Sequence, residues 1–312
     1  MVIKEDYPKD FQEFLFRFRT EEDCWNYIFD LRWPNGFICP KCNNGKYWLT
    51  DKGLIHCAIC EHQTSITGGT IFHGTRKPLL LWFYIIWWVV AQKTGASANN
   101  LMDFMGFGSY ETAWTWLHKL RRAMVRPGRD KLSGEVEVDE TYIGGKEIGK
   151  GNQGRGADTK TLVVVAAECK GKQIGRVRFG CIYESKGKHL QGFIEDNIEH
   201  GSLIITDGWS GYSFLSETKN YKYKQKIISG SGQEAHELLP HVHMVVSLVK
   251  RWLNGTHQGN VSPKHLPYYL DEFAFRFNRK MSTYRGKLFY RLMQQAVTTP
   301  PVPIKEIVKQ QI

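Results

Sequence analysis

Four residues suited to metal-dependent chemistry stand in the second half of the chain. Asp139 lies within VEVDETYIGG, Asp207 ends SLIITD, and His243 and Lys250 lie within HVHMVVSLVKRWL. Residues 208–242 separate Asp207 from His243, and Lys250 follows His243 by about two helical turns. Carboxylates and an imidazole can hold a divalent cation that activates an attacking oxygen in phosphoryl transfer. The four residues therefore predict a site for phosphodiester chemistry, in which Lys250 holds a phosphate.

The first carboxylate position has an alternative in the same segment. An acid in the apolar alternation around Asp139 destabilises the fold when buried, unless it is paired or binds a metal ion. Glu137 shares the face of Asp139 in an extended strand and is its rival, whereas Glu140 points the other way. Asp207 also has a structural alternative, because the turn or helix that follows it could use its side chain as an N-cap.

The third ligand position is less constrained by the sequence. Glu234 and Glu237 lie nearest to the expected interval after Asp207 but come early, and Glu272 comes far too late. His243 fits the interval, and Lys250 lies about 20° from it around a helix, on the same face. Taken alone, His243 is an ordinary helical histidine. The ligand hypothesis depends on the coincidence of the interval, the helix and the downstream lysine.

The elements that position these residues follow one another between residues 134 and 293. Three strand-like runs, VEVDETYIGG, TLVVVAAEC and IGRVRFGCIY, precede a helix over KHLQGFIEDNIEH and strands over SLIIT and YKYKQKII. The segment from Pro240 to Met293 is predicted to be mostly helical. The glycine-rich GKGNQGRGADTK is expected to be a loop between the first two strands. This order predicts an α/β fold with a mixed sheet, ribonuclease-H-like, for the catalytic core.

Two CxxC pairs, CPKC and CAIC, indicate a zinc ribbon over residues 33–76. Each pair can lie on a tight turn, and two such turns close a tetrahedral Zn²⁺ site. The ligands are Cys39, Cys42, Cys57 and Cys60. Because all four are thiolates, no coordination position stays open, and we expect the zinc to be structural. The neighbouring His56 and His62 are not expected to be ligands.

Helical segments are predicted on both sides of the ribbon. Residues 1–32 form a helical lead. Residues 77–128 contain the apolar run LLLWFYIIWWVVA, followed by a short helix, a turn at Gly106–Gly108 and a second helix from Ser109 whose end is basic. Helix, tight glycine turn and helix is the pattern of a helix-turn-helix DNA-binding segment. PGRDKLSG links this segment to the core, and residues 294–312 form a tail.

The chain of 312 residues is strongly basic, with a formal net charge of +11 and a pI of about 9.2. Such a charge favours a polyanionic partner, here double-stranded DNA. The basic residues gather at the end of the helix-turn-helix segment and in the C-terminal helices, although a merely solvated charged face is the alternative. We expect phosphate contacts from Lys119, Arg121, Arg122, Arg251, Lys264, Arg276, Arg279 and Lys280.

The cysteine usage and the apolar segments predict a cytoplasmic protein that associates with the nucleoid when bound to DNA. Cys24, Cys169 and Cys181 are scattered and expected to be buried small hydrophobes, which suits a reducing compartment. The N-terminal MVIKEDYPKDFQEF has no apolar core typical of a signal peptide. LLLWFYIIWWVVA is shorter than the roughly 20 residues that a membrane helix needs, so we expect it to be buried in the protein.

Three segments, VEVDETYIGGK, ITDGWSGY and KRWLNGTHQGNVSPKHLPYYLDEFAFRFNRK, resemble bacterial insertion-sequence transposases of the ISXO-like group. The resemblance extends from about Cys39 to Arg279, and the last segment is very specific. The group has an N-terminal zinc ribbon and a DDE-type catalytic domain. The resemblance implies that Asp139 and Asp207 are the catalytic aspartates and Lys250 the downstream basic residue. Alignment on the lysine puts His243 at the third position, where members carry glutamate, asparagine or histidine.

The resemblance also implies the reaction and the partners. A transposase of this group cuts a mobile element at its terminal inverted repeats and transfers it to target DNA, with Mg²⁺ or Mn²⁺. We expect it to act as a homo-oligomer, at least a dimer, when synapsed on DNA. Two other functions stay open: a DNA-binding regulator whose core has lost catalysis, and a structure-specific nuclease or resolvase of the same fold.

Overall fold

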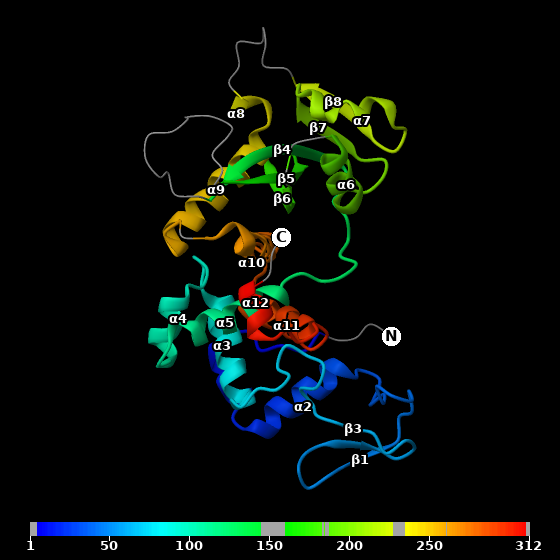
Figure 1. Ribbon diagram of the computed structural model, residues 1–312, viewed down its shortest axis with the longest axis vertical. Helices are drawn as coiled ribbons and strands as arrows, with labels where there is room; N and C mark the ends of the chain where they lie inside the picture. Colours follow the sequence, from blue (N-terminus) through cyan, green and yellow to red (C-terminus); the bar gives the residue numbers. More distant parts are fainter. Residues whose placement is uncertain are drawn as a thin grey trace. The chain divides into compact units, whose positions relative to one another are not determined.

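The computed structural model describes residues 5–144, 160–182, 184, 187–226, 235–259 and 261–309, and the chain divides into two units (Figure 1). Unit 1 combines the chain up to Arg126 with Met281–Lys309, and unit 2 runs from Pro127 to Lys280. The candidate metal ligands therefore all belong to unit 2, whereas the four paired cysteines belong to unit 1.

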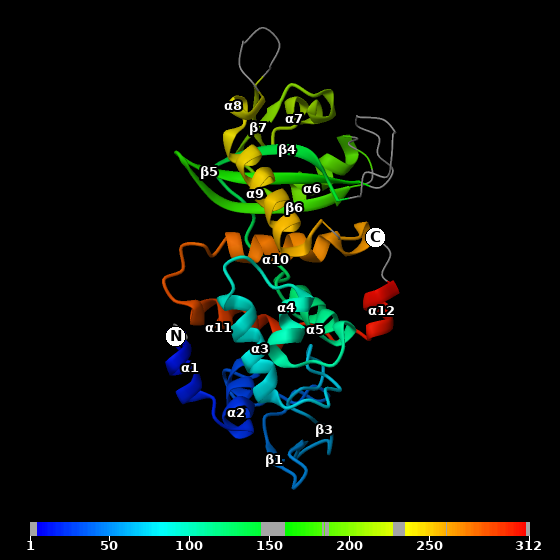
Figure 2. The same cartoon turned by 90° about the vertical axis from the view of Figure 1, so that its left-hand side faces the viewer.

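Among its described residues, unit 2 is built on a five-stranded mixed sheet in the order β6-β5-β4-β7-β8. Figure 2 shows four of these strands, β6, β5, β4 and β7. The strands are β4 (Glu135–Ile143), β5 (Thr161–Lys170), β6 (Gln173–Ile182), β7 (Leu203–Asp207) and β8 (Lys222–Lys226). β4, β5 and β6 pair antiparallel, whereas β7 is parallel to β4, and β8 is parallel to β7. A three-stranded antiparallel meander, extended by two parallel strands beside its first strand, is the ribonuclease-H-like arrangement and confirms the predicted fold class.

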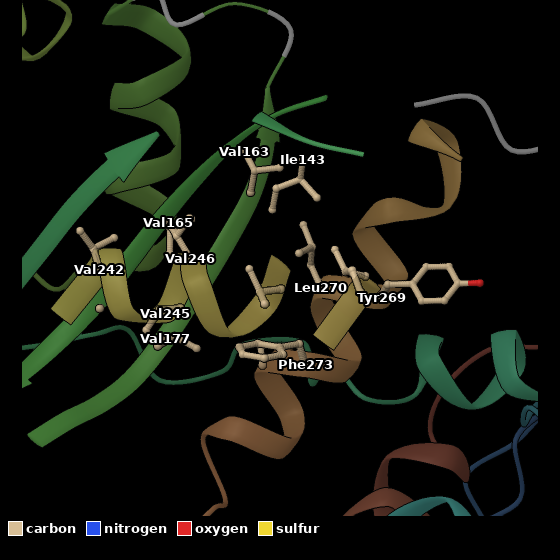
Figure 3. Packing of buried hydrophobic residues seen from close by; sticks show 14 of the residues in the cluster. Ile143, Val163, Val165, Val177, Val242, Val245, Val246, Tyr269, Leu270 and Phe273 are labelled. Carbon is tan, nitrogen blue, oxygen red and sulfur yellow. The ribbon is translucent and has the colours of Figure 1, made fainter. Parts of the chain in front are cut away.

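Helices cover both faces of this sheet, which explains why β5 is an almost continuous apolar run. Val165 and alternate residues of β5 face α9 (Pro240–His257) and α10 (Leu266–Phe277). Figure 3 shows valines of α9 directed at the valines of the strands. Val164 points to the opposite face and packs in a second cluster with α6 (Gly187–Asn197). The alternation of β4 and β5 therefore decides which face each side chain of the site reaches.

Short helices complete unit 2. They are η1 (Ser210–Tyr212), α7 (Phe214–Glu217), α8 (Ala235–Leu238) and η2 (Pro263–His265). η1 and α7 follow the end of β7, α8 directly precedes α9, and η2 leads into α10. The glycine-rich loop expected between the first two strands lies, except for Lys160, outside the described residues.

Unit 1 packs helices from both ends of the sequence around an aromatic cluster. The helices are α1 (Phe11–Arg17), α2 (Glu21–Arg32), α3 (Leu79–Ala91) and α11 (Arg285–Ala296). The ring of Phe289 in α11 lies with its centroid 5.4 Å from that of Phe14 and 5.7 Å from that of Phe83. The catalytic core was predicted to extend to residue 293. In the structure α11 instead buries its apolar face in unit 1, and unit 2 ends at Lys280. Periodicity shows that a helix has an apolar face but not which core receives it.

The remaining helices of unit 1 include the predicted pair around a glycine turn. They are α4 (Ala98–Met105), α5 (Tyr110–Arg122) and α12 (Ile304–Lys309). The Ser97 side chain caps α4 by accepting a hydrogen bond from the Asn100 N–H, and Gly106, with φ of 63°, ends it in the left-handed conformation. The expected order of helix, turn and helix is therefore present.

The very apolar α3 is a buried helix, as its short length predicts. Trp82, Phe83 and Ile86 are each at most 1% exposed. Within the part of the chain that the structure describes, no helix combines the length and the apolarity needed to cross a membrane.

Candidate active site

β4, β7 and α9 bring Asp139, Asp207 and His243 together. β4 and β7 are parallel neighbours, and their register pairs Glu137 with Ile205. Continued by two residues, this register puts Asp139 level with Asp207 on the same face of the sheet. That face is covered by α9, where His243 Nε2 lies 3.7 Å from Asp139 Oδ2. Asp139 thus lies beside His243 and within electrostatic reach of Asp207, although the ligand atoms of the three residues do not all lie within 4.8 Å of one another.

Asp207 does not cap η1, whose N-cap position is occupied by Trp209, but its side chain contacts the turn that precedes this helix. Asp207 Oδ1 accepts a hydrogen bond from the Trp209 N–H at 3.2 Å, in the turn that leads to η1. This contact fixes the direction of the carboxylate at the end of β7. This contact and metal binding are compatible, because a carboxylate has two oxygens and several acceptor positions.

Burial and neighbouring charges shift the pKa values of Asp139 and Lys250 in this site. Burial raises the pKa of the Asp139 carboxyl, His243 and Lys250 oppose this shift, and the negative charge of Asp207 adds to it. Burial lowers the pKa of Lys250, the neighbouring Lys160 lowers it further, and Asp139 acts in the opposite direction. Lys160 and Lys250 therefore lie within electrostatic reach of each other, and Lys250 also interacts with Asp139.

Glu140 is a further titratable group that sequence reasoning set aside. It faces away from α9, as strand alternation predicts, toward Tyr212 of η1. Burial raises its pKa to about 7, the negative charges of Asp139 and Asp207 add to the rise, and the Tyr212 hydroxyl opposes it. Even so, Glu140 Oε1 is buried without a well-formed hydrogen bond to any described residue. Its position directly after Asp139 in the sequence was the signal that could have identified Glu140 as a residue of the site.

The alternative ligands from the same region are engaged or lie elsewhere. Glu137 faces α9 as expected, but its buried carboxylate accepts hydrogen bonds from the backbone N–H groups of His241 and Val242. Glu237 is exposed on α8. Glu234 lies outside the described residues.

Two arginines expected to contact phosphates are held by internal contacts instead. Arg276 pairs with the buried Glu272, with 2.8 Å between Nη2 and Oε1, which also removes Glu272 as a metal ligand. Arg121 is only 1% exposed, and its Nη2 donates to the Ala96 carbonyl at 3.0 Å. Arg121 therefore has almost no exposed surface for a phosphate, whereas for the half-buried Arg276 a phosphate contact stays a prediction. Helical spacing identified a basic face on α5 but not the contact with Ala96 that turns Arg121 inward.

The other expected phosphate contacts are at least partly accessible. Arg251, Lys264 and Lys280 are exposed, whereas Lys119, Arg122 and Arg279 are half-buried. Lys280 Nζ donates to the Ile174 carbonyl at 2.6 Å and lies 3.8 Å from the ring centroid of Phe277. A role in DNA binding stays a prediction for these six residues.

The paired cysteines converge in unit 1 on a small antiparallel sheet. Its strands are β1 (Tyr47–Leu49), β2 (Ile55–Cys57) and β3 (Gln63–Thr64). The Sγ atoms lie 3.6 Å apart between Cys39 and Cys60 and 3.5 Å apart between Cys42 and Cys57, and all four lie within 4.8 Å of one another. Backbone N–H groups of Cys60 and Ile59 lower the pKa of the Cys57 thiol to about 6. This four-cysteine cluster is consistent with structural zinc.

Acids on neighbouring parallel strands of a ribonuclease-H-like sheet, in a chain that also holds a four-cysteine ribbon, are features of DDE-type transposases. The ISXO2-like transposase domain matches residues 131–278, and the transposase zinc-ribbon domain matches residues 19–63. The first range contains the candidate site, and the second contains the four cysteines. The chain belongs to the ISXO2-like transposase family, with an N-terminal zinc ribbon and a DDE-type catalytic domain.

One curated relative comes from a mobile element. The "Uncharacterized protein in transposable element ISH50" of Halobacterium salinarum is 27% identical over 282 residues, which cover 83% of this chain and 91% of the relative. This relative is archaeal, so the bacterial origin expected from the sequence is not supported. Among solved structures, a chain of the cryo-EM structure of the simian T-cell lymphotropic virus intasome with PP2A regulatory subunit B56 gamma shares 11% identity, with a TM-score of 0.32. The match covers 66% of this chain and 76% of the intasome chain. The fold class rests on the strand topology and not on this weak likeness.

The raised pKa of Glu140 predicts a pH-dependent stability of the metal-free protein. Its folded value of about 7 lies above the ordinary value of 4.5, so the folded state binds this proton more tightly than the unfolded chain. The contribution of Glu140 to the free energy of unfolding therefore falls as the pH rises from 4.5 to about 7 and stays low above it. Glu140→Gln should remove this fall and stabilise the protein above pH 7 by at most roughly 3 kcal/mol.

Urea unfolding of the metal-free full chain, followed between about pH 5 and pH 8, measures this effect. Glu237→Gln, which changes an exposed glutamate of unit 2, is the control and should leave the pH dependence unaltered. A Glu140→Gln variant with the same pH dependence as the parent protein would show that burial does not hold the proton on Glu140.

Proposed function

We propose that the protein cleaves phosphodiester bonds at the ends of a transposable element and joins the resulting 3′-hydroxyl to target DNA. The observation that carries this proposal is the convergence of Asp139, Asp207 and His243 from β4, β7 and α9. Membership of the DDE-type family supports it, and so does the relative found in a transposable element. We further propose that the catalytic metal ligands are two aspartates and a histidine.

The donor set fits a divalent cation. Two carboxylates lie level on adjacent strands, and the pKa of Asp139 rises partly because of Asp207, so a cation between them would relieve a repulsion that the chain leaves in place. We assign Asp139, Asp207 and His243 as the residues that hold Mg²⁺ or Mn²⁺. An ion held there supplies the positive charge that activates the attacking oxygen and stabilises the leaving oxygen. His243 coordinates as the neutral ring, and replacing one acid by an imidazole favours Mn²⁺ over Mg²⁺.

The side chains around the donor set handle the DNA. Lys250 lies on α9 beside Asp139 and holds a phosphate next to the bond that is cut. In the first reaction a water molecule attacks the phosphorus, and the 3′ oxygen of the element leaves as a hydroxyl. In the second reaction this hydroxyl attacks a phosphodiester of the target, whose own 3′ oxygen leaves. Both displacements occur at one site, so two copies of the chain on two element ends account for paired joining.

His243 provides the most specific test of this function. His243→Ala should reduce cleavage of end-containing DNA about 100-fold or more while DNA binding stays intact, because one of three ligands is lost. His243→Glu should restore part of the Mg²⁺-supported activity. A nicking and strand-transfer assay beside a DNA-binding assay measures both effects.

Met244→Ala is the matched control, since Met244 is the next residue on α9 and is 55% exposed. It should cleave like the parent protein. Full activity in His243→Ala would remove this histidine from the site. Binding without any divalent-dependent nicking in the parent protein would favour a regulator, and cleavage without joined products a nuclease or resolvase.

We also propose that the four-cysteine cluster holds one structural Zn²⁺. The binding energy of a closed thiolate site is folding energy for so small a module. Cys42→Ser should therefore unfold residues 33–76 and leave unit 2 folded, since all four ligands lie in unit 1. Zinc content of freshly purified protein, together with hydrogen exchange across the whole chain, measures this. Cys181→Ser, in β6, is the control that should keep its zinc, and parent protein without zinc would overturn the assignment.

A further inference from the structure

Glu137 and His241 form a contact beside the candidate site that the proposed chemistry does not use. Glu137 lies on β4 two residues before Asp139 and is 2% exposed. One carboxylate oxygen, Oε2, accepts hydrogen bonds from the backbone N–H groups of His241 at 2.8 Å and Val242 at 3.0 Å. The other, Oε1, faces His241 Nδ1 at 3.0 Å. A single buried side chain thus makes three contacts with the start of α9.

α9 depends on this carboxylate because its own sequence supplies no cap. The helix begins at Pro240, which has no N–H, and is preceded by Leu239, whose side chain cannot accept a hydrogen bond. The next two N–H groups, of His241 and Val242, have no partner within the helix. Glu137 supplies that partner from another element, and a negative charge at a helix N-terminus is also favourable to the helix dipole.

The His241 ring adds a second point of attachment. Its Nε2 lies 2.9 Å from the carbonyl oxygen of Gly171, in the turn between β5 and β6. Both ring nitrogens therefore face oxygen acceptors, Glu137 on one side and Gly171 on the other. The start of α9 is fixed to the central strand and to the β5–β6 turn at the same time.

We propose that Glu137 and His241 are positioning residues that set the rotation and the height of α9, and thereby hold His243 against Asp139. β4 and α9 contact each other at two successive positions. Glu137 of β4 meets His241 of α9, and two residues further along both elements Asp139 meets His243. A rotation of α9 by one residue would turn His243 by about 100° away from β4. This inference rests on the proposed function, because it concerns the geometry of the same donor set.

A second use of these residues would be a metal site of their own. Cys169 Sγ lies with the ligand atoms of Glu137 and His241 within 4.8 Å of one another. However, Glu137 Oε2 is already taken by two N–H groups, and His241 is held between two acceptors. Burial raises the pKa of the Cys169 thiol to about 12, which favours the neutral form. The contacts favour positioning, and metal content tests the alternative.

The test measures Mn²⁺ binding to the full-length protein, read from the electron paramagnetic resonance signal of free Mn²⁺, beside thermal unfolding. Glu137→Ala and His241→Ala should weaken Mn²⁺ binding about 10-fold, because α9 would no longer hold His243 against Asp139 and misplacing one ligand costs about this much. Glu137→Gln should lose less, since its amide oxygen can still accept from the α9 N–H groups. Asp139→Asn identifies the site by losing the binding itself.

Glu168→Gln is the matched control. Glu168 is 3% exposed on β5 and accepts hydrogen bonds from the Ser133 N–H and from Arg176, away from α9. Its replacement should lower the melting temperature but leave the Mn²⁺ dissociation constant unchanged. If Glu137→Ala does not fold, the comparison of Glu137→Gln with Glu168→Gln decides, and weaker Mn²⁺ binding is expected only in the former.

Three outcomes are distinguishable. Folded Glu137 and His241 variants that bind Mn²⁺ like the parent protein overturn the positioning role and leave the proposed function standing. A second zinc per chain that disappears in His241→Ala also overturns it, in favour of the metal site with Cys169. Parent protein that binds no Mn²⁺ at Asp139 contradicts the proposed function itself.

Discussion

The site depends on how β4, the central strand of unit 2, accommodates buried acidic side chains. A carboxylate in apolar surroundings is unstable in its charged form unless N–H donors or positive charges surround it. Glu137 meets this need with the first N–H groups of α9, whereas burial brings the pKa of Glu140 to about 7. Asp139 has His243 and Lys250 nearby but also faces the charge of Asp207. At Asp139 and Asp207 the chain leaves two negative charges within reach of each other, which a cation would neutralise.

The pairing of β4 with β5 determines which face of the sheet each of these acids occupies. The two strands are in continuous antiparallel register from Glu135 opposite Cys169 to Ile143 opposite Thr161. A slip of one residue would move Asp139 to the face of α6 and bring Glu140 under α9. The valines of β5 prevent this, because they pack in separate clusters on the two faces. The hydrophobic core thus decides which acids meet the helix that carries His243.

Much of this arrangement could be predicted from the sequence, and the exceptions have a common cause. Strand order, the face of Glu137 and Asp139, and the cysteine cluster follow from short-range patterns and ligand spacing. The burial of Arg121 against Ala96 and the packing of α11 in unit 1 depend on partners distant in sequence. The same holds for the capping of α9 by Glu137, since a helix start without a capping residue does not reveal which strand supplies the acceptor.

In the proposed site, Asp139, Asp207 and His243 hold one catalytic cation between β4, β7 and α9. The most direct test of this site is a crystal structure of the protein soaked in Mn²⁺, with the ion located by its anomalous scattering. We expect a peak within coordinating distance of oxygens of Asp139 and Asp207 and of His243 Nε2, at roughly 2.0–2.3 Å. A peak held by Asp139 and Asp207 with Glu140 or Glu237 in place of His243 would contradict the proposed ligand set.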